Sequence, residues 1–244
     1  MSELFPLRYV VPVLAGLVLL AVYPVAKHLE TTERRRYYLL QIITLLGALA
    51  GAKLVVLMGD RYWPVVPIHS WDEVLRAGRS IVGGLLFGFL TAELAKPLLG
   101  YTLPPNDRFA ALLPFSLAIG RVGCFLQGCC RGLPHAGIIS VTYADGIPRW
   151  PTQLFEAAFD VAAGIVFVML VRRGILKGRL FALFLMAYGV YRFLTEFIRV
   201  TPRVLFGYSV YQLFCVAMIA AGALALYARR GGFDERPDPA TAAA

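Results

Sequence analysis

Seven apolar stretches, each about as long as a membrane-crossing helix, constrain the fold of this 244-residue chain more than any other feature. They cover residues 9–26, 38–58, 80–99, 109–128, 151–171, 180–198 and 208–228. A helix needs about 20 mostly apolar residues to cross the hydrocarbon core of a bilayer. The chain is 59% hydrophobic and only 16% charged, whereas a soluble domain averages about 25% charged residues. We therefore expect an all-α integral membrane protein with about seven transmembrane helices, which excludes a coiled coil, a disulfide-stapled mini-protein and a disordered chain.

The basic residues give an expected orientation. Thirteen of the 24 Lys and Arg residues fall in one set of loops and eight in the other, and cytoplasmic loops carry the excess of positive charge. This sorting places the N-terminus outside and the C-terminus in the cytoplasm. Residues 1–230 are expected to form a single transmembrane helical domain, and residues 231–244 a disordered cytoplasmic tail. The net charge of +9 then reflects topology and anionic lipid, and no nucleic-acid partner is expected.

Two loops stand out. The loop 129–150 is longer than a bare connection needs, and Val141-Thr142-Tyr143 followed by the turn residues Ala144-Asp145-Gly146 predicts a small strand element in an outer-face loop subdomain. The loop 59–79 contains Trp63 and Trp71. Trp favours the headgroup level, so this loop is expected at the membrane interface.

Ionisable residues inside the apolar stretches are functional candidates, because charge is costly in lipid. They are Lys53, Glu93, Arg121, Glu156, Asp160, Arg192 and Glu196. In the expected orientation, Glu93 alone falls in the inner half of the bilayer, and four helices bring charge to the outer half. Two arginines beside carboxylates are typical of a clamp for an anionic group, and a phospholipid headgroup is the anion available at that depth. Helical spacing places Tyr188, Arg192 and Glu196 on one face, so a simple Arg192–Glu196 ion pair is an alternative.

Glycines and cysteines gather in the same expected region. The candidate glycines for headgroup binding are Gly83, Gly84, Gly123, Gly128 and Gly132; close helix packing is the alternative. Cys124, Cys129 and Cys130 lie within seven residues, and packing, a disulfide or functional thiols all remain open for them. Their spacing matches no common zinc pattern, so no metal and no cofactor are expected. Cys215 is expected to be a core residue.

Four segments in order resemble the prolipoprotein diacylglyceryl transferases. The family's Gly-Arg signature is similar to the segment Gly120-Arg121-Val122-Gly123 with Gln127, Gly128 and Gly132. Its His-Gly-Gly segment is similar to Val82-Gly83-Gly84, and its Gln-Leu-Tyr-Glu segment to Gln153-Leu154-Phe155-Glu156. Its Tyr-Gly-x-x-Arg-Phe-x-x-Glu-Phe-x-Arg segment is similar to residues 188–199. The resemblance covers about residues 79–228.

This resemblance implies a bacterial inner-membrane transferase that moves the diacylglyceryl group of phosphatidylglycerol, or another anionic phospholipid, onto a prolipoprotein lipobox cysteine and releases glycerol phosphate. It implies that Arg121 and Arg192 hold the phosphate, oriented by Glu156 and Glu196, with Tyr188 in the catalytic set. Gln153 joins the glycines in binding the headgroup.

The chain also departs from the family pattern. Val82 stands where the family has the His that is a candidate base, Cys124 where it has Asn, and Trp150 where it has the His before Pro. His135 and His69 are the outer-side histidines of this chain and are alternative candidates for the base. Two alternatives therefore stay open: a non-catalytic phospholipid-binding protein of the same fold, and a membrane thiol–disulfide protein that uses the three clustered cysteines.

Overall fold

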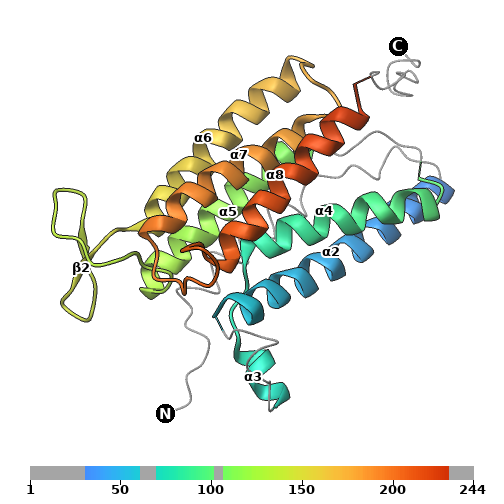
Figure 1. Ribbon diagram of the computed structural model, residues 1–244. Coiled ribbons are helices and arrows are strands. Elements are labelled where there is room, and N and C mark those ends of the chain that lie inside the picture. The colour runs from blue at the N-terminus through green and yellow to red at the C-terminus, as the bar shows by residue number, and fades with distance from the viewer. Residues whose placement is uncertain (1–30, 61–69, 102–106, 231–244) are drawn as a thin grey trace. The chain divides into compact units, whose positions relative to one another are not determined.

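The structure is a computed structural model that describes residues 31–60, 70–101 and 107–230 (Figure 1). The first apolar stretch, His28, Trp63, His69 and the C-terminal tail lie outside the described residues. Of the expected interfacial loop 59–79, the structure describes the first two residues, at the end of α2, and the residues from 70 onward, where Trp71 is exposed.

Six helices in the described part of the chain are long and apolar enough to cross a membrane. They are α2 (Thr31–Asp60), α4 (Ile81–Leu98), α5 (Asp107–Gln127), α6 (Thr152–Arg172), α7 (Leu180–Thr195), which the 3-10 turn η2 (Glu196–Ile198) extends, and α8 (Val210–Ala228). Each begins and ends within a few residues of its expected stretch, except that α2 begins seven residues earlier. The helical membrane fold is confirmed for these six stretches.

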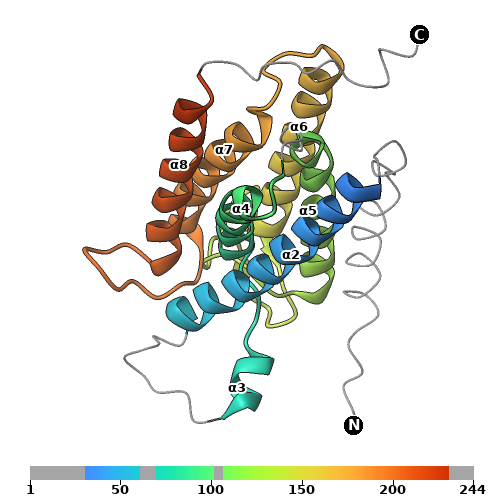
Figure 2. The same ribbon diagram turned by 90° about the vertical axis from the view of Figure 1, so that its right-hand side faces the viewer.

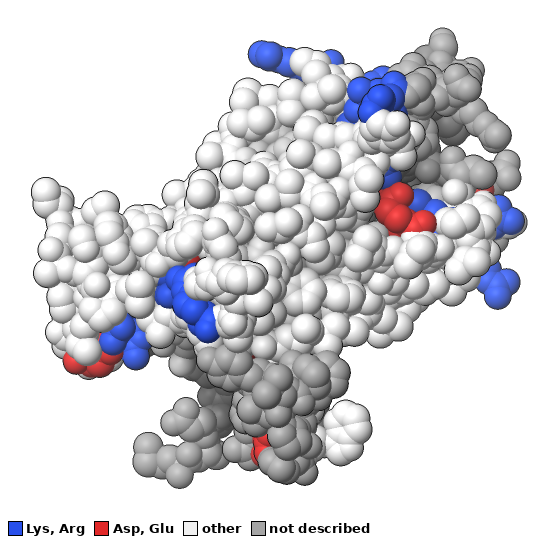
Figure 3. Space-filling view, viewed as in Figure 1, with Lys and Arg blue, Asp and Glu red and all other residues white. Residues whose placement is uncertain are grey.

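The outer surface of these helices suits lipid. Large apolar side chains are exposed along them, among them Leu46, Leu94, Leu194 and Leu224. The face drawn in Figure 3 is mostly free of charged side chains. Lipid tails solvate such surfaces, so these residues need no protein partner.

The described residues divide into two compact units, which we describe in turn. The first contains residues 107–184 and 194–200. Its helices α5 and α6 lie side by side in both ribbon views (Figures 1 and 2). A Cβ added at Gly164 on α6 would lie 2.7 Å from the Phe115 ring on α5, so the missing side chain permits this close packing. Asp107 accepts hydrogen bonds from the backbone N–H groups of Gly178 and Leu180 and so satisfies the start of α7.

A short hairpin in this unit joins α5 to α6. Strand β1 (Val141–Thr142) pairs antiparallel with β2 (Pro148–Arg149), with Val141 opposite Arg149. Asp145 in the turn accepts a hydrogen bond from the Ile147 N–H and pairs with Arg131 at 2.8 Å and Arg149 at 3.2 Å. The strand element predicted in the loop 129–150 is confirmed, with Tyr143 in the turn instead of the strand.

The second unit contains residues 31–60, 70–101, 185–193 and 201–230. Here α2 packs along α4 through small residues: a Cβ at Gly51 would lie 2.3 Å from Phe87, and one at Gly47 would overlap Thr91. Helix α8 begins with a capping box formed by Ser209 and Gln212.

Two in-span charges of this unit have structural partners. Lys53 donates to the backbone carbonyls of Val74 and Ala77 at the end of the short helix α3 (Trp71–Arg76). Cations at a helix C-terminus satisfy its last carbonyls. Glu93 pairs with Lys96 on the same helix and with Arg229 at 2.7 Å. Both contacts explain these residues without chemistry at a site.

Candidate active site

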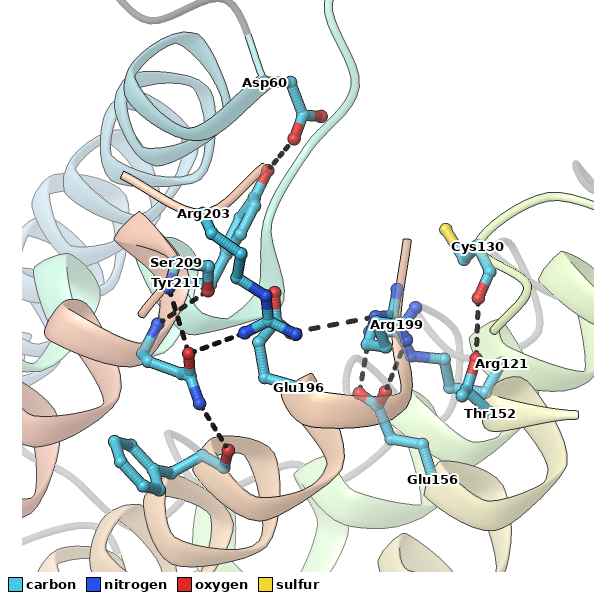
Figure 4. Close-up of polar contacts among 12 residues, drawn as sticks. Asp60, Arg121, Cys130, Thr152, Glu156, Glu196, Arg199, Arg203, Ser209 and Tyr211 are labelled. Carbon is cyan, nitrogen blue, oxygen red and sulfur yellow. Dashed lines mark hydrogen bonds and ion pairs between the residues drawn. The ribbon is translucent and has the colours of Figure 1, made fainter. Parts of the chain in front are cut away.

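One buried carboxylate in the first unit contacts two arginines. Glu156 on α6 places Oε1 2.7 Å from Nη2 of Arg121 on α5, and Oε2 3.8 Å from Nη1 of Arg199 (Figure 4). Glu156 is 1% exposed, Arg121 7% and Arg199 9%. Charges buried in this way are stable only when paired. The three residues therefore form one charged cluster inside the unit.

Two further carboxylates belong to this cluster. Glu196, the first residue of η2, is fully buried and places Oε2 3.8 Å from Nε of Arg199. Asp160 lies one turn after Glu156 on α6 and is also fully buried. Among the described residues, neither carboxylate oxygen of Asp160 has a hydrogen-bond partner. The cluster therefore combines two guanidiniums with three carboxylates, and a guanidinium has enough donors to contact an anionic group as well as a carboxylate.

Gly132 fixes where Arg199 lies. Its backbone forms an isolated antiparallel bridge with Arg199, and the next residue, Leu133, donates its N–H to the Ile198 carbonyl at 2.8 Å. A Cβ added at Gly132 would lie 2.7 Å from the Trp150 Cβ and 2.8 Å from the Ile198 carbonyl oxygen. Only glycine permits this approach of three chain segments. The structure therefore gives Gly132 a packing role, and headgroup binding by Gly132 stays a prediction.

Gly128 ends α5 and turns the chain toward the cysteines. It has a φ of +70°, and its N–H donates to the Phe125 carbonyl while the Cys129 N–H donates to the Cys124 carbonyl. This pair of bonds is a Schellman motif, whose left-handed position favours glycine. Such a motif brings the side chains of its two ends, here Cys124 and Cys129, into contact.

Two residues at the start of α6 hold the cysteine segment. Thr152 donates through Oγ1 to the Cys130 carbonyl at 2.8 Å, and Gln153 donates through Nε2 to the Cys129 carbonyl at 2.6 Å. Gln153 also accepts a hydrogen bond from the Tyr143 hydroxyl at 2.8 Å. Because both ends of the Gln153 amide contact protein, the structure gives this residue a positioning role; headgroup binding by Gln153 stays a prediction.

The pKa values of the two adjacent thiols, those of Cys129 and Cys130, are shifted in opposite directions. Hydrogen bonds from the Cys124 and Cys129 thiols, supported by the positive charges of Arg121 and Arg199, lower the pKa of Cys130 against the opposing effect of desolvation. The same contacts with its two sulfur neighbours, together with burial, raise the pKa of the Cys129 thiol. The four cysteines are free thiols in this structure, and Cys215 is a fully buried core residue in α8.

The remaining predicted residues occupy defined places. Gly123 is buried on α5, between Arg121 and Cys124. Tyr188 and Arg192 lie in the second unit, buried on α7, with 0% and 5% exposure. In that unit Gly83 and Gly84 face α2: a Cβ at Gly83 would lie 2.3 Å from the Gly51 carbonyl oxygen, and one at Gly84 3.6 Å from that of Ala48. The alternative of helix packing therefore has direct support for both glycines, and their headgroup role stays a prediction.

A second polar group closes the turn between α7 and α8. Gln212 donates to the Phe193 carbonyl at 3.2 Å and accepts from Arg203 at 2.9 Å, and the Tyr211 hydroxyl donates to Asp60 at 2.8 Å (Figure 4). These contacts tie the start of α8 to α2 and to α7 within the second unit. Outside the site, His135 stacks on Trp150 with ring centroids 3.7 Å apart.

The sequence prediction missed Arg199 as a site residue. It stands just after the apolar stretch 180–198 and is therefore not among the ionisable residues inside the stretches. A signal was present, because Arg199 is the last residue of the segment 188–199 and lies three residues after Glu196. The structure shows that this segment ends in η2 and returns Arg199 to the buried cluster.

Comparison with known proteins identifies the family of this chain. The family model "Prolipoprotein diacylglyceryl transferase" matches residues 3–228. This chain belongs to that family. It is 36% identical over 200 residues to the phosphatidylglycerol–prolipoprotein diacylglyceryl transferase of Polynucleobacter asymbioticus, which covers 78% of this chain and 74% of the relative.

Other relatives carry the same name. A protein of Methylococcus capsulatus is 36% identical over 75% of this chain and 73% of its own length. Another, from Clostridium perfringens, is 28% identical over 76% of this chain and 75% of its own length. Family membership and the six apolar helices make this prolipoprotein diacylglyceryl transferase homologue a multi-pass protein of the bacterial inner membrane.

Proposed function

We propose that this chain transfers the diacylglyceryl group of phosphatidylglycerol to the thiol of a prolipoprotein lipobox cysteine and releases glycerol phosphate. The observation that carries the proposal is the buried pair Arg121 and Arg199, held by one carboxylate, in a chain of the prolipoprotein diacylglyceryl transferase family. The substrates in this proposal are those that the names of the relatives contain, phosphatidylglycerol and a prolipoprotein.

The cluster supports the bond cleavage that this reaction requires. The acceptor sulfur attacks the terminal glyceryl carbon of the lipid, the bond from that carbon to the phosphate oxygen breaks, and the electron pair leaves with the phosphate. We expect Arg121 and Arg199 to stabilise the charge that develops there. A guanidinium has five donors in a fixed fork, so it can contact a carboxylate and a phosphate together. One well-placed donor in a water-poor site contributes about 3–4 kcal/mol to such a step.

The other predicted residues enter the proposal through their motifs. Arg192 and Tyr188 belong to the same motif as Glu196, and we assign Arg192 to phosphate binding and Tyr188 to the catalytic set on that basis. Gly83, Gly84, Gly123 and Gln153 are assigned to the headgroup region in the same way. Glu156 and Glu196 orient the arginines.

The proposal includes a topology. The N-terminus faces outward, the C-terminus faces the cytoplasm, a seventh helix precedes α2, and the hairpin lies in an outer-face loop. In this orientation the α5–α6 loop lies on the outer face, and we propose that the acceptor cysteine approaches the site from that side.

The test uses purified full-length protein with labelled phosphatidylglycerol and a lipobox peptide. We expect glycerol phosphate release by the unaltered chain and a loss of about 100-fold or more in Arg121→Ala and Arg199→Ala, because each removes a charged donor. Arg173→Ala is the matched control, since Arg173 is exposed after α6. Absence of release with every thiol or alcohol acceptor would overturn the proposal.

One observation keeps a second function in view. Val82 is 1% exposed and carries no group that can accept a proton, which favours a protein that binds phospholipid without reacting. In that case Arg121→Ala and Arg199→Ala would weaken lipid retention, measured by mass spectrometry of the purified protein, while the unaltered chain would form no product.

A further inference from the structure

Three cysteine sulfurs converge beside the charged cluster. The Sγ atoms of Cys124, Cys129 and Cys130 all lie within 4.8 Å of one another. Cys124 is buried in the last turn of α5, one turn after Arg121. The spacing of the three residues in the sequence matches no common zinc pattern, but the fold creates a three-sulfur site that the spacing does not reveal.

The backbone of this segment is held from outside. The Schellman motif at Gly128 brings Cys129 back over Cys124, and Thr152 and Gln153 bind the carbonyls of Cys130 and Cys129. Cys130 has a φ of +59°, a left-handed conformation that costs a non-glycine residue energy and recurs at ligand sites. A disulfide needs only two sulfurs close together, whereas a metal site needs all three to converge.

We infer that Cys124, Cys129 and Cys130 form a zinc site with an open fourth position that binds the acceptor thiol. This inference rests on the proposed function for the identity of the acceptor. Catalytic zinc sites use three protein ligands and keep the fourth position for water or substrate. Thiolate ligands favour zinc or copper(I) over hard cations, and zinc has no redox chemistry that would consume the acceptor thiol.

The distances suit this metal. Zinc–sulfur bonds of about 2.3 Å place the sulfurs of a tetrahedral site about 3.8 Å apart. The observed upper limit of 4.8 Å exceeds that separation by only about 1 Å, which side-chain rotation can supply.

The site supplies the chemistry that Val82 does not. Binding of the acceptor thiol to zinc displaces a water molecule and releases the thiol proton to solvent, which leaves a zinc-bound thiolate. Its sulfur forms the bond to the terminal glyceryl carbon, the carbon–oxygen bond breaks, and glycerol phosphate leaves with the electron pair. The product is a neutral thioether, a weak zinc ligand, so the next thiol can replace it.

Metal binding is the first test. The full-length protein, purified in detergent under reducing conditions, is expected to bind one Zn²⁺ per chain, with only sulfur at about 2.3 Å in X-ray absorption besides the fourth ligand. Each of Cys124→Ala, Cys129→Ala and Cys130→Ala should weaken zinc binding at least about 100-fold, and Thr152→Val about 10- to 100-fold as a supporting residue. Cys215→Ala, which removes the buried core cysteine of α8, should bind zinc like the unaltered chain.

The competing results are distinct. The inference would be overturned if the protein bound no stoichiometric zinc, or if the three cysteine variants bound zinc as tightly as the unaltered chain. It would also be overturned if protein isolated without reductant contained a disulfide among these cysteines and added zinc did not change that disulfide. The melting temperatures of all four variants are compared, because each removes one thiol. A variant that loses zinc through general unfolding would melt at a lower temperature than Cys215→Ala.

Activity separates this inference from the proposed function. We expect chelator-treated protein to lose glycerol phosphate release to the lipobox peptide and to regain it on addition of Zn²⁺, with phosphatidylglycerol binding unchanged. Full activity of zinc-free protein would overturn the zinc site and leave the proposed function in place. Zinc binding without any transfer would instead overturn the proposed function and the catalytic role of the metal.

Discussion

Glu156 places one carboxylate oxygen against each of two buried guanidiniums. Replacing it with glutamine keeps its size but removes the charge that both arginines need. Breaking a buried ion pair costs about 3–5 kcal/mol, so Glu156→Gln should lower the melting temperature and reduce glycerol phosphate release together. Glu93→Gln is the control, because Glu93 is partly exposed in its contacts with Lys96 and Arg229 and such pairs contribute about 1 kcal/mol or less. Equal effects of the two substitutions would contradict this account of the cluster.

Two glycines of the same signature should respond to alanine in opposite ways. At Gly132 an added Cβ would meet the Trp150 Cβ and the Ile198 carbonyl oxygen, whereas at Gly120 it would meet nothing within 4 Å. Gly132→Ala should therefore displace the segment that carries Arg199 and reduce transfer. Gly120→Ala should leave activity intact and raise stability by up to about 1 kcal/mol, because alanine favours a helix interior over glycine. Thermal unfolding and initial rates of the two variants measure both effects.

The chemistry of single residues was predictable only where the membrane made it costly. Arg121 and Glu156 stand out in the sequence because a charge inside an apolar stretch needs a reason. Arg199 lies beyond its stretch, and its burial depends on the bridge with Gly132, a contact between distant segments that no local pattern encodes. The convergence of three sulfurs has a more local origin, since it depends on the left-handed turn at Gly128 and on the hydrogen bonds from Thr152 and Gln153.

At the scale of elements, the hairpin between α5 and α6 makes a prediction about pH. Desolvation opposes ionisation of Asp145, but the Ile147 N–H and the charges of Arg149 and Arg131 outweigh it and lower the pKa of Asp145 below its ordinary value. A carboxyl with a lowered folded-state pKa stabilises the fold fully above its unfolded pKa, about 3.9, and loses that contribution as the pH falls through the folded-state value. The protection of the amides in residues 141–149 against hydrogen exchange, relative to their intrinsic exchange rates at each pH, should therefore fall below about pH 4.

Asp145→Asn supplies the comparison for that measurement. It keeps the shape of the side chain and removes the titration. The hairpin amides of this variant should therefore be less protected than those of the unaltered chain at neutral pH, and their protection should change little further on acidification. A parallel response of both proteins would mean that another group governs the hairpin.

Helix positions follow from the sequence because lipid sets the length of an apolar stretch, and the six described spans confirm this. The geometry at the end of α7 does not follow in the same way. The α-helix ends at Thr195 and Glu196 begins a 3-10 turn, so the helical spacing that relates Tyr188 to Arg192 changes before Glu196. A residue count predicts a shared face only while the helix type stays constant.

At the scale of the whole molecule, we attribute most of the net charge of +9 to the way the chain is oriented in the membrane. Thirteen of its Lys and Arg residues lie in the loops predicted to be cytoplasmic and eight in the others, and this difference is what retains a loop inside. The hairpin residue Ser140 and the loop residue Lys177 lie beyond opposite ends of α6. The proposed orientation therefore places Ser140 outside and Lys177 in the cytoplasm.

Accessibility of single cysteines tests this directly. In a background in which all four native cysteines are alanine, Ser140→Cys should react with a membrane-impermeant maleimide in intact spheroplasts, and Lys177→Cys only after the membrane is permeabilised. The reverse pattern would contradict the proposed orientation, because it would place the α5–α6 loop on the cytoplasmic side of the membrane. Labelling of both positions in denatured protein controls for thiol reactivity, so that only the location of each loop decides the result.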